Sequence, residues 1–299
     1  MVVRILDFIF AARPMLHLPI WSIFLVSYHY RHGDFSASAL IVLIGLTLIG
    51  SGTYYLNQVY DYESDLLNRK LGFLQKGLLE KRQLLIAGIT LSIVAPIIGA
   101  VQSLVTLAVF VPLIAGSIAY SLPPFRVKDR PLAGLLVNAV GYGVLIPMTV
   151  PGMLTRLDRL DGLLAGYFFL TVAATYLLTV IPDRAGDEKA GKRTYATMLT
   201  DRTIIITALA LLAGSILVSL LLLHHLLVPI STIGFGLCLF ALISKQPSHV
   251  LLACKVPILL LSLLAGYYYP GYFIFLVVLL VATRIYYRRR FGIPYPRLN

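Results

Sequence analysis

The feature that most constrains this chain is a series of apolar runs, each about 20 residues long. An α-helix of that length crosses the hydrocarbon core of a bilayer, and the mean hydropathy of +0.86 is that of a membrane protein. The runs predict an all-α, polytopic membrane protein, which we interpret as a single domain over residues 1–299. The ten candidate spans lie at 14–30, 37–60, 83–101, 103–120, 132–153, 160–182, 203–223, 226–244, 249–266 and 269–287.

The two ends of the chain affect how many of these runs cross the membrane. The only break in the last two runs lies at residues 267–271, so one of the two could be re-entrant, which would leave nine crossings in place of ten. Residues 1–14 contain no small-residue cleavage site after their apolar part, and we therefore expect an uncleaved start.

Three residues inside apolar runs need separate interpretation. Cys238 and Cys254 have no His or Cys at ligand spacing, so we expect buried thiols with no metal site. Asn138 is polar within the fifth run, where such a side chain more often bonds a neighbouring helix than a substrate. The alternative for Asn138 is that it lines a pocket.

The charge of the chain is strongly positive, with 25 Lys and Arg against 13 Asp and Glu. These basic residues lie in short loops between spans, where the positive-inside rule accounts for them, so we expect no nucleic-acid partner. With the N-terminus inside, 16 basic residues fall in inner loops, and only Arg31, Arg156 and Arg159 fall outside. The rule predicts a multi-pass protein of a prokaryotic cell membrane whose N-terminus and even-numbered loops are cytoplasmic.

Two acidic segments follow apolar runs on this inner side. Asn57, Asp61 and Asp65 are four residues apart after the second run, a spacing that puts them on one helix face. Asp183 and Asp187 repeat the spacing after the sixth run. A solvated helix cap would explain one such segment, but not its repetition at the same kind of place. Carboxylates beside a bilayer need a cation, and oxygen ligands suit Mg²⁺, so the four aspartates are candidate magnesium ligands.

A third inner loop, residues 119–131, lies between the two acidic segments. Its prolines predict a constrained turn that presents basic side chains. Four aspartates, a diphosphate and two Mg²⁺ together leave a charge of about −3 for basic residues to balance. The basic residues placed to do this are Arg69, Lys70, Arg126, Lys128, Arg184 and Lys192.

These motifs together resemble the UbiA superfamily of intramembrane prenyltransferases. The first family signature, N-x-x-x-D-x-x-x-D, is matched by Asn57, Asp61 and Asp65. The second, D-x-x-G-D-x-x-x-G-x-x-T, is matched by Asp183, Gly186, Asp187, Gly191 and Thr194. The family also has a tyrosine-led loop that ends in a basic residue, which resembles Tyr120, Ser121, Pro123, Pro124, Arg126 and Lys128. The likeness extends over the whole chain in order and spacing.

The resemblance implies about nine transmembrane helices around a central cavity open toward the cytoplasmic side and the membrane. It implies an Mg²⁺-dependent transferase that moves a prenyl group from an allylic prenyl diphosphate to a hydrophobic acceptor and releases diphosphate. We assign two Mg²⁺ to Asp61, Asp65, Asp183 and Asp187, which with Asn57 form the catalytic set. The predicted diphosphate ligands are Arg69, Lys70, Tyr120, Arg126, Lys128, Arg184 and Lys192.

The sequence leaves the acceptor open. Relatives use aromatic quinone precursors, tetrapyrrole alcohols, ether-lipid precursors and carotenoid ends, and we favour an aromatic or quinone precursor or an ether-lipid precursor. The alternative is a carotenoid elongase of the lycopene type, because the DYESDL and Ile-Pro-Asp stretches resemble that branch and the N-R-P-x-x-S-G stretch of quinone-pathway members is absent. A cation-coupled transporter is the alternative from another class, although transporters place acids near the midplane, often in inverted repeats.

Overall fold

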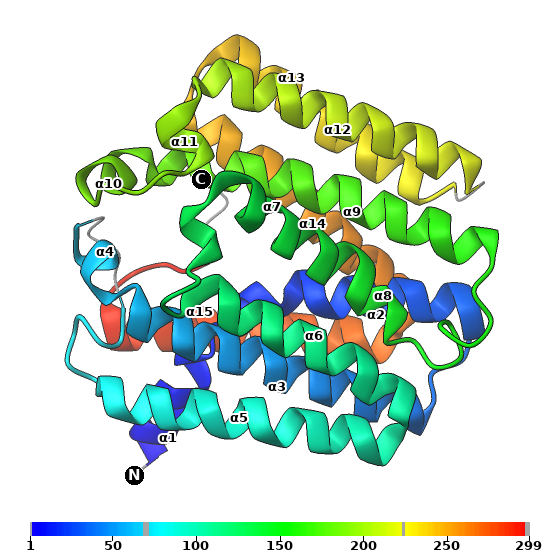
Figure 1. Cartoon of the computed structure of the whole chain (residues 1–299), viewed down its shortest axis with the longest axis horizontal. Coiled ribbons are helices and arrows are strands. Elements are labelled where there is room, and N and C mark those ends of the chain that lie inside the picture. The colour runs from blue at the N-terminus through cyan, green and yellow to red at the C-terminus, as the bar shows by residue number, and fades with distance from the viewer. Residues whose placement is uncertain (1, 68–71, 223–224, 297–299) are drawn as a thin grey trace.

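The computed structural model describes residues 2–67, 72–222 and 225–296, and its regular structure there is wholly helical (Figure 1). Ten helices in this part of the chain are long and apolar enough to cross a membrane. The predicted all-α membrane fold is therefore confirmed. The long helices are α2 (Leu18–His32), α3 (Ala37–Tyr60), α5 (Lys81–Gln102), α6 (Leu104–Ser121), α7 (Pro131–Val140), α9 (Arg159–Val180), α12 (Asp201–Leu221), α13 (Leu227–Ser244), α14 (Pro247–Tyr268) and α15 (Pro270–Phe291).

Shorter elements extend or connect these helices. A helix that the sequence analysis did not predict, α1, precedes α2 and joins it through the 3-10 turn η1. A π-helical turn, η3, continues α7 into α8, so the fifth span ends at Met148 and not at residue 153 as predicted. The short elements are α1 (Val2–Ala11), η1 (Pro14–His17), α4 (Tyr62–Leu67), η2 (Val127–Asp129), η3 (Gly141–Leu145), α8 (Ile146–Met148), η4 (Ile181–Asp183), α10 (Arg184–Lys189) and α11 (Tyr195–Met198).

The long helices form a closed ring. In the described part of the chain, nine helices pack in chain order, each against the next, and the last of them packs against the first. They are α2, α3, α5, α6, α7, α9, α12, α13 and α14. The last helix, α15, packs on α14 and η1 outside this ring. Both α14 and α15 are full helices of 22 residues, so among the described residues the fold agrees with ten crossings: nine in the ring and a tenth beside it.

Local sequence explains where two of the ring helices begin and how closely two of them pack. Ser36 and Ser103 begin α3 and α6 as N-caps, accepting bonds from the Ala39 and Thr106 amides at 3.1 and 3.0 Å. Gly52 of α3 faces Gly88 of α5, and a Cβ on Gly52 would lie 3.2 Å from the Gly88 carbonyl oxygen. Small residues at this crossing let the two backbones approach, as in other membrane helix pairs.

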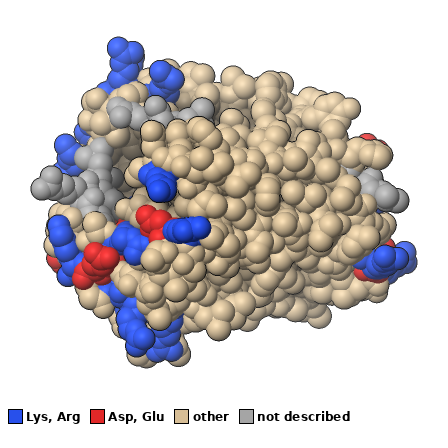
Figure 2. All heavy atoms as spheres, turned by 90° about the horizontal axis from the view of Figure 1, so that it is seen from above, with Lys and Arg blue, Asp and Glu red and all other residues tan. Residues whose placement is uncertain are grey.

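The outer surface of the ring suits lipid. Large apolar side chains such as Val101, Leu104 and Ile243 point outward with exposed fractions of 77%, 78% and 70%. On the face shown in Figure 2, acidic and basic side chains gather at the two ends and leave a broad uncharged band between them. Cys238 and Cys254 are buried free thiols, as predicted.

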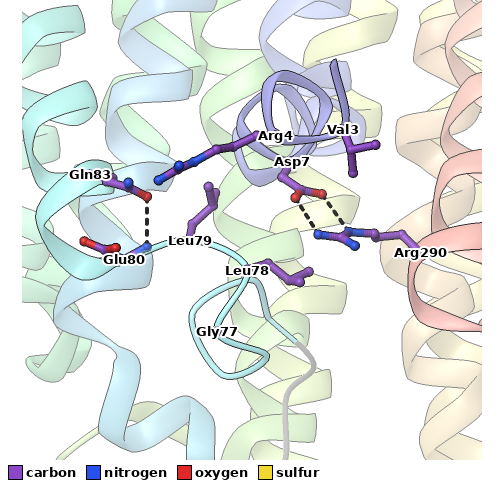
Figure 3. Close-up of a pocket in the computed structure, with 9 residues that line it drawn as sticks. All are labelled: Val3, Arg4, Asp7, Gly77, Leu78, Leu79, Glu80, Gln83 and Arg290. Atoms are coloured by element: carbon purple, nitrogen blue, oxygen red, sulfur yellow. Dashed lines mark hydrogen bonds and ion pairs between the residues drawn. The ribbon is translucent and has the colours of Figure 1, made fainter. Parts of the chain in front are cut away.

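Both ends of the described chain lie at one end of the bundle (Figure 1). Figure 3 shows Asp7 of α1 facing Arg290 of α15, whose Nε and Nη2 donate to the two carboxylate oxygens at 2.9 and 2.7 Å. The Tyr286 hydroxyl donates to the same carboxylate, which is only 2% exposed. The tenth helix is thus fastened to the N-terminal helix by a buried carboxylate.

We expect Arg290→Ala to lower the midpoint of thermal unfolding in detergent by several degrees. The substitution leaves the Asp7 carboxylate buried without its cation, which is costly in a low-dielectric setting. Arg289→Ala removes an exposed arginine next to it and should change the midpoint little. Equal midpoints for the two variants would contradict a structural role of the Asp7–Arg290 pair.

Candidate active site

The first aspartate segment lies where α3 breaks. We expected one continuous helix, but α3 ends at Tyr60, Asp61 takes a non-helical conformation and α4 starts at Tyr62. The hydrogen-bond spacing of a helix nevertheless continues across the break, because the Asp61 amide donates to Asn57 O and the Asp65 amide donates to Asp61 O, both at 2.8 Å. Asn57, Asp61 and Asp65 therefore stay one helical turn apart although the helix breaks at Asp61.

The middle loop and the N-terminal segment supply partners to the first aspartate segment. The Ser121 hydroxyl donates to Asn57 Oδ1, and Lys128 Nζ donates to Asp61 Oδ1. Arg13, at the junction of α1 and η1, brings Nη2 to 4.0 Å from Asp65 Oδ2. Cations from two other parts of the chain thus meet the carboxylates, as their position beside the membrane requires.

The second aspartate segment folds back on itself. Gly191 has φ +63°, a left-handed conformation that other L-residues rarely adopt, and it reverses the chain after α10. The reversal brings Lys192 Nζ to 3.5 Å from Asp187 Oδ1, and the Thr194 hydroxyl donates to Asp187 Oδ2 at 3.2 Å. The glycine and threonine of the motif therefore serve to surround one buried carboxylate, that of Asp187.

The two aspartate segments meet at one end of the bundle, where α4 lies against α10 (Figure 1). Lys128 contacts the first segment and is influenced by a charge of the second. Burial lowers the pKa of Lys128, the Asp61 carboxylate opposes that shift, and Arg126 and Lys192 lower the pKa further. Lys128 therefore pairs with the carboxylate of the first segment within electrostatic reach of the cation of the second.

The other predicted site residues are more dispersed. The Tyr120 hydroxyl lies near Asp61 and within hydrogen-bonding reach of Asn138 and Tyr176. Arg126 pairs with Asp129 at 3.0 Å, and Arg184 donates to Asp201 and to the Leu199 carbonyl, which ties α10 to the start of α12. Arg69 and Lys70 lie outside the described residues.

The metal assignment stays a prediction. Asp65 and Asp187 are buried, whereas Asp61 and Asp183 are partly exposed. Among the described residues, no group of three or more acidic, histidine or cysteine side chains is arranged as a complete metal site.

An apolar cavity of about 680 Å³ is lined by residues of α3 and α9, the helices that the two aspartate segments follow. The polar side chains that line it include those of Tyr54, Asn138, Tyr142 and Tyr176, and Tyr120 links Asn138 and Tyr176 to the neighbourhood of Asp61. We call the end of the cavity formed by these four residues its mouth. Asn138 therefore lines a pocket, the alternative that the sequence left open, while its amide nitrogen also donates to the Gly134 carbonyl.

Several of these residues were not predicted from the sequence, although some left a signal. Tyr54 stands three residues before Asn57, and Tyr176 seven before Asp183, spacings that place each tyrosine on the helix face of its motif. Tyr142 projects from the π-helical turn η3, which no sequence pattern indicated. Arg13 was counted only as an inner-loop charge, because its partner Asp65 is distant in sequence.

Comparison with known proteins identifies the class. The sequence model of the UbiA prenyltransferase family matches residues 18–251. The chain belongs to this family. The predicted family and the predicted class of enzyme, a prenyltransferase, are thereby confirmed.

A curated UbiA relative, the lycopene elongase/hydratase of Corynebacterium glutamicum, is 30% identical over 178 residues. That match spans 56% of this chain and 60% of the relative. A UbiA homologue from Archaeoglobus fulgidus, solved with GPP and Mg²⁺, superposes with a TM-score of 0.70 at 16% identity. The superposition covers 88% of this chain and 98% of the homologue. A digeranylgeranylglyceryl phosphate synthase superposes with a TM-score of 0.67 at 12% identity, over 90% of this chain and 98% of the synthase. These structural matches establish a shared UbiA fold.

We expect Thr194→Val to lower prenyl-transfer efficiency by about tenfold or more, since a side chain that orients a site carboxylate typically contributes that much. Thr194→Ser keeps the hydroxyl and should retain most of the activity. Thr207→Val changes an exposed threonine of α12 and should match the wild type. Steady-state rates in detergent measure all three, and a Thr194→Val rate equal to that of Thr207→Val would show that the hydroxyl has no role.

Proposed function

We propose that this chain transfers a prenyl group from an allylic prenyl diphosphate to a lipophilic acceptor, at the end of the bundle where α4 meets α10. The observation that supports this is the meeting of both aspartate segments, each beside basic side chains, at the ends of α3 and α9, two helices that also line an apolar cavity. We infer that residues 1–299 act as one domain and that this end faces the cytoplasm, because the basic residues concentrate in its loops.

The side chains at this end fit magnesium. Asp61, Asp65, Asp183 and Asp187 offer carboxylate oxygens and Asn57 offers an amide oxygen, the donor atoms that Mg²⁺ prefers. Bound there, Mg²⁺ would stabilise negative charge on the oxygens of the departing diphosphate. The A. fulgidus relative has been solved with GPP and Mg²⁺ and with DMAPP and Mg²⁺, which supports this choice, and we propose two ions.

The basic side chains would hold the diphosphate. Lys128, Lys192 and Arg13 already lie against the aspartates, so a diphosphate bound among them would find cations in place without a large rearrangement. We propose that Tyr120 and Arg126 assist from the middle loop. The predicted roles of Arg69, Lys70 and Arg184 remain proposals of the same kind.

The reaction breaks the bond between the allylic carbon and the diphosphate oxygen, and the electron pair leaves with the diphosphate. The acceptor carbon or oxygen then bonds to the allylic carbon and loses a proton. The cavity suits this step because its wall is mostly apolar and would keep water away from the allylic cation. The aromatic faces of Tyr54 and Tyr142 at the mouth can stabilise positive charge.

For the acceptor, the carotenoid alternative now has a specific observation in its favour. The lycopene elongase/hydratase of C. glutamicum is 30% identical over 178 residues, in agreement with the sequence resemblance noted above. Lys255 is the one charged residue among the described side chains that line the cavity, which suits a hydrocarbon substrate. We therefore propose an acyclic carotenoid as acceptor, with aromatic or quinone precursors and ether-lipid precursors as the competing classes. The two opposed aspartate segments at one end give no support to a transporter.

We expect Asp61→Ala and Asp183→Ala to reduce Mg²⁺-dependent prenyl transfer by at least about 10³-fold while leaving the protein folded in detergent, which thermal unfolding checks. Glu188→Ala is the matched control, because Glu188 is an exposed carboxylate on the same short helix as Asp187. Full turnover by both aspartate variants would remove the proposed metal site.

We expect the purified protein, given Mg²⁺ and labelled prenyl diphosphates, to prenylate an acyclic carotenoid in preference to a quinone precursor or a glycerol-phosphate ether. Mass spectrometry of the products measures this directly. Product formed only from an aromatic acceptor would contradict the proposed carotenoid acceptor but would support the proposed prenyltransferase activity. No product from any acceptor would count against the proposed function.

A further inference from the structure

The wall of the cavity is completed by a part of the chain beyond the family match. Leu280 of α15 and the tail residues Tyr295 and Pro296 line the cavity together with residues of the ring. The family match ends at residue 251, before α15 begins. The last helix and its tail therefore contribute surface to a cavity that the ring encloses only in part.

A chain reversal brings the tail to the cavity. Gly292 ends α15 with φ +71°, and its amide donates to the Arg288 and Tyr287 carbonyls. The backbone then turns back along the helix, and the Tyr295 ring lies 4.6 Å from the Tyr287 ring at an interplanar angle of 43°. The tail is thus packed against α15 and not extended away from the bundle.

Tyr295 lies near a cation of the first aspartate segment, Arg13. Burial raises the pKa of Tyr295, and the Arg13 guanidinium nearby opposes that rise. Arg13 is also the cation 4.0 Å from Asp65, and Tyr54, which lines the mouth, lies within electrostatic reach of Tyr295. The tail therefore borders both the mouth of the cavity and the first aspartate segment.

We propose that the tail, residues 293–296, is a specificity-determining wall that limits the size of the acceptor end beside the donor. An aromatic ring and a proline form the boundary of the cavity at this place. We expect this boundary to admit a slender acyclic isoprenoid end and to exclude an end that carries a ring. This inference rests on the proposed function for the identity of the ligand. It adds a selecting element outside the aspartate motifs.

The first part of the test measures how fast a reagent from the solution reaches the cavity, in the absence of the reaction. In a background with Cys238→Ala and Cys254→Ala, the cavity-lining Thr171→Cys reports access by its rate of labelling with a membrane-impermeant maleimide in detergent. Removal of residues 293–299 should raise this rate several-fold, and Tyr295→Ala should raise it less. Tyr267→Ala, which changes a tyrosine that is 74% exposed, should leave the rate unchanged. Thermal unfolding confirms that each variant is folded, and an unchanged rate in both tail variants overturns the proposal.

The second arm measures selection. The ratio of kcat/KM for an acyclic carotenoid to that for the carotenoid with cyclised ends should fall by about tenfold or more in Tyr295→Ala, while Tyr267→Ala keeps the wild-type ratio. An unchanged ratio overturns the selecting role even if labelling rises. A wild-type protein that transfers no prenyl group to any acceptor would defeat the proposed function instead, and the labelling rates would still decide whether the tail closes the cavity.

Discussion

A carboxylate that is buried near the edge of a bilayer needs a cation or hydrogen-bond donors beside it, and this constraint organises the end of the bundle that carries the motifs. Asp61 is paired with Lys128, a cation from the middle loop, and Asp187 lies beside Lys192 in its own turn. Lys128 and Asp61 come from different segments, so this pair joins the middle loop to the first aspartate segment, whereas the Asp187–Lys192 pair closes a turn within the second. A site built in this way has charges already gathered when an anionic ligand arrives, which is the arrangement that favours departure of a diphosphate.

The ring of helices and the site depend on each other. The site needs a dry space beside its charges, and nine helices that close from α2 to α14 provide it. Residues at the junction serve both parts: Tyr120 lies near Asp61 on one side and near Asn138 and Tyr176 on the other. The mouth of the cavity is therefore set by side chains whose positions are fixed by the same helices that end in the aspartate segments.

The sequence predicted what short-range patterns encode. Span positions followed from run length, and the aspartate face followed from spacing, even though α3 breaks at Asp61. Residues that act through contacts distant in sequence were not predicted. Arg13 meets Asp65 only after the chain has folded, and the position of Tyr142 depends on a π-helical turn. The tail shows the same limit, since nothing local to Tyr295 indicates that a reversal at Gly292 returns it to the cavity.

The central claim is that both aspartate segments together hold a metal-bound diphosphate. Electron paramagnetic resonance of Mn²⁺, titrated into the protein with a thiodiphosphate analogue of the donor, measures it directly. We expect saturable Mn²⁺ binding that requires the analogue and is lost in Asp65→Asn and equally in Asp187→Asn. Wild-type binding in either variant would contradict it, because one segment alone would then suffice.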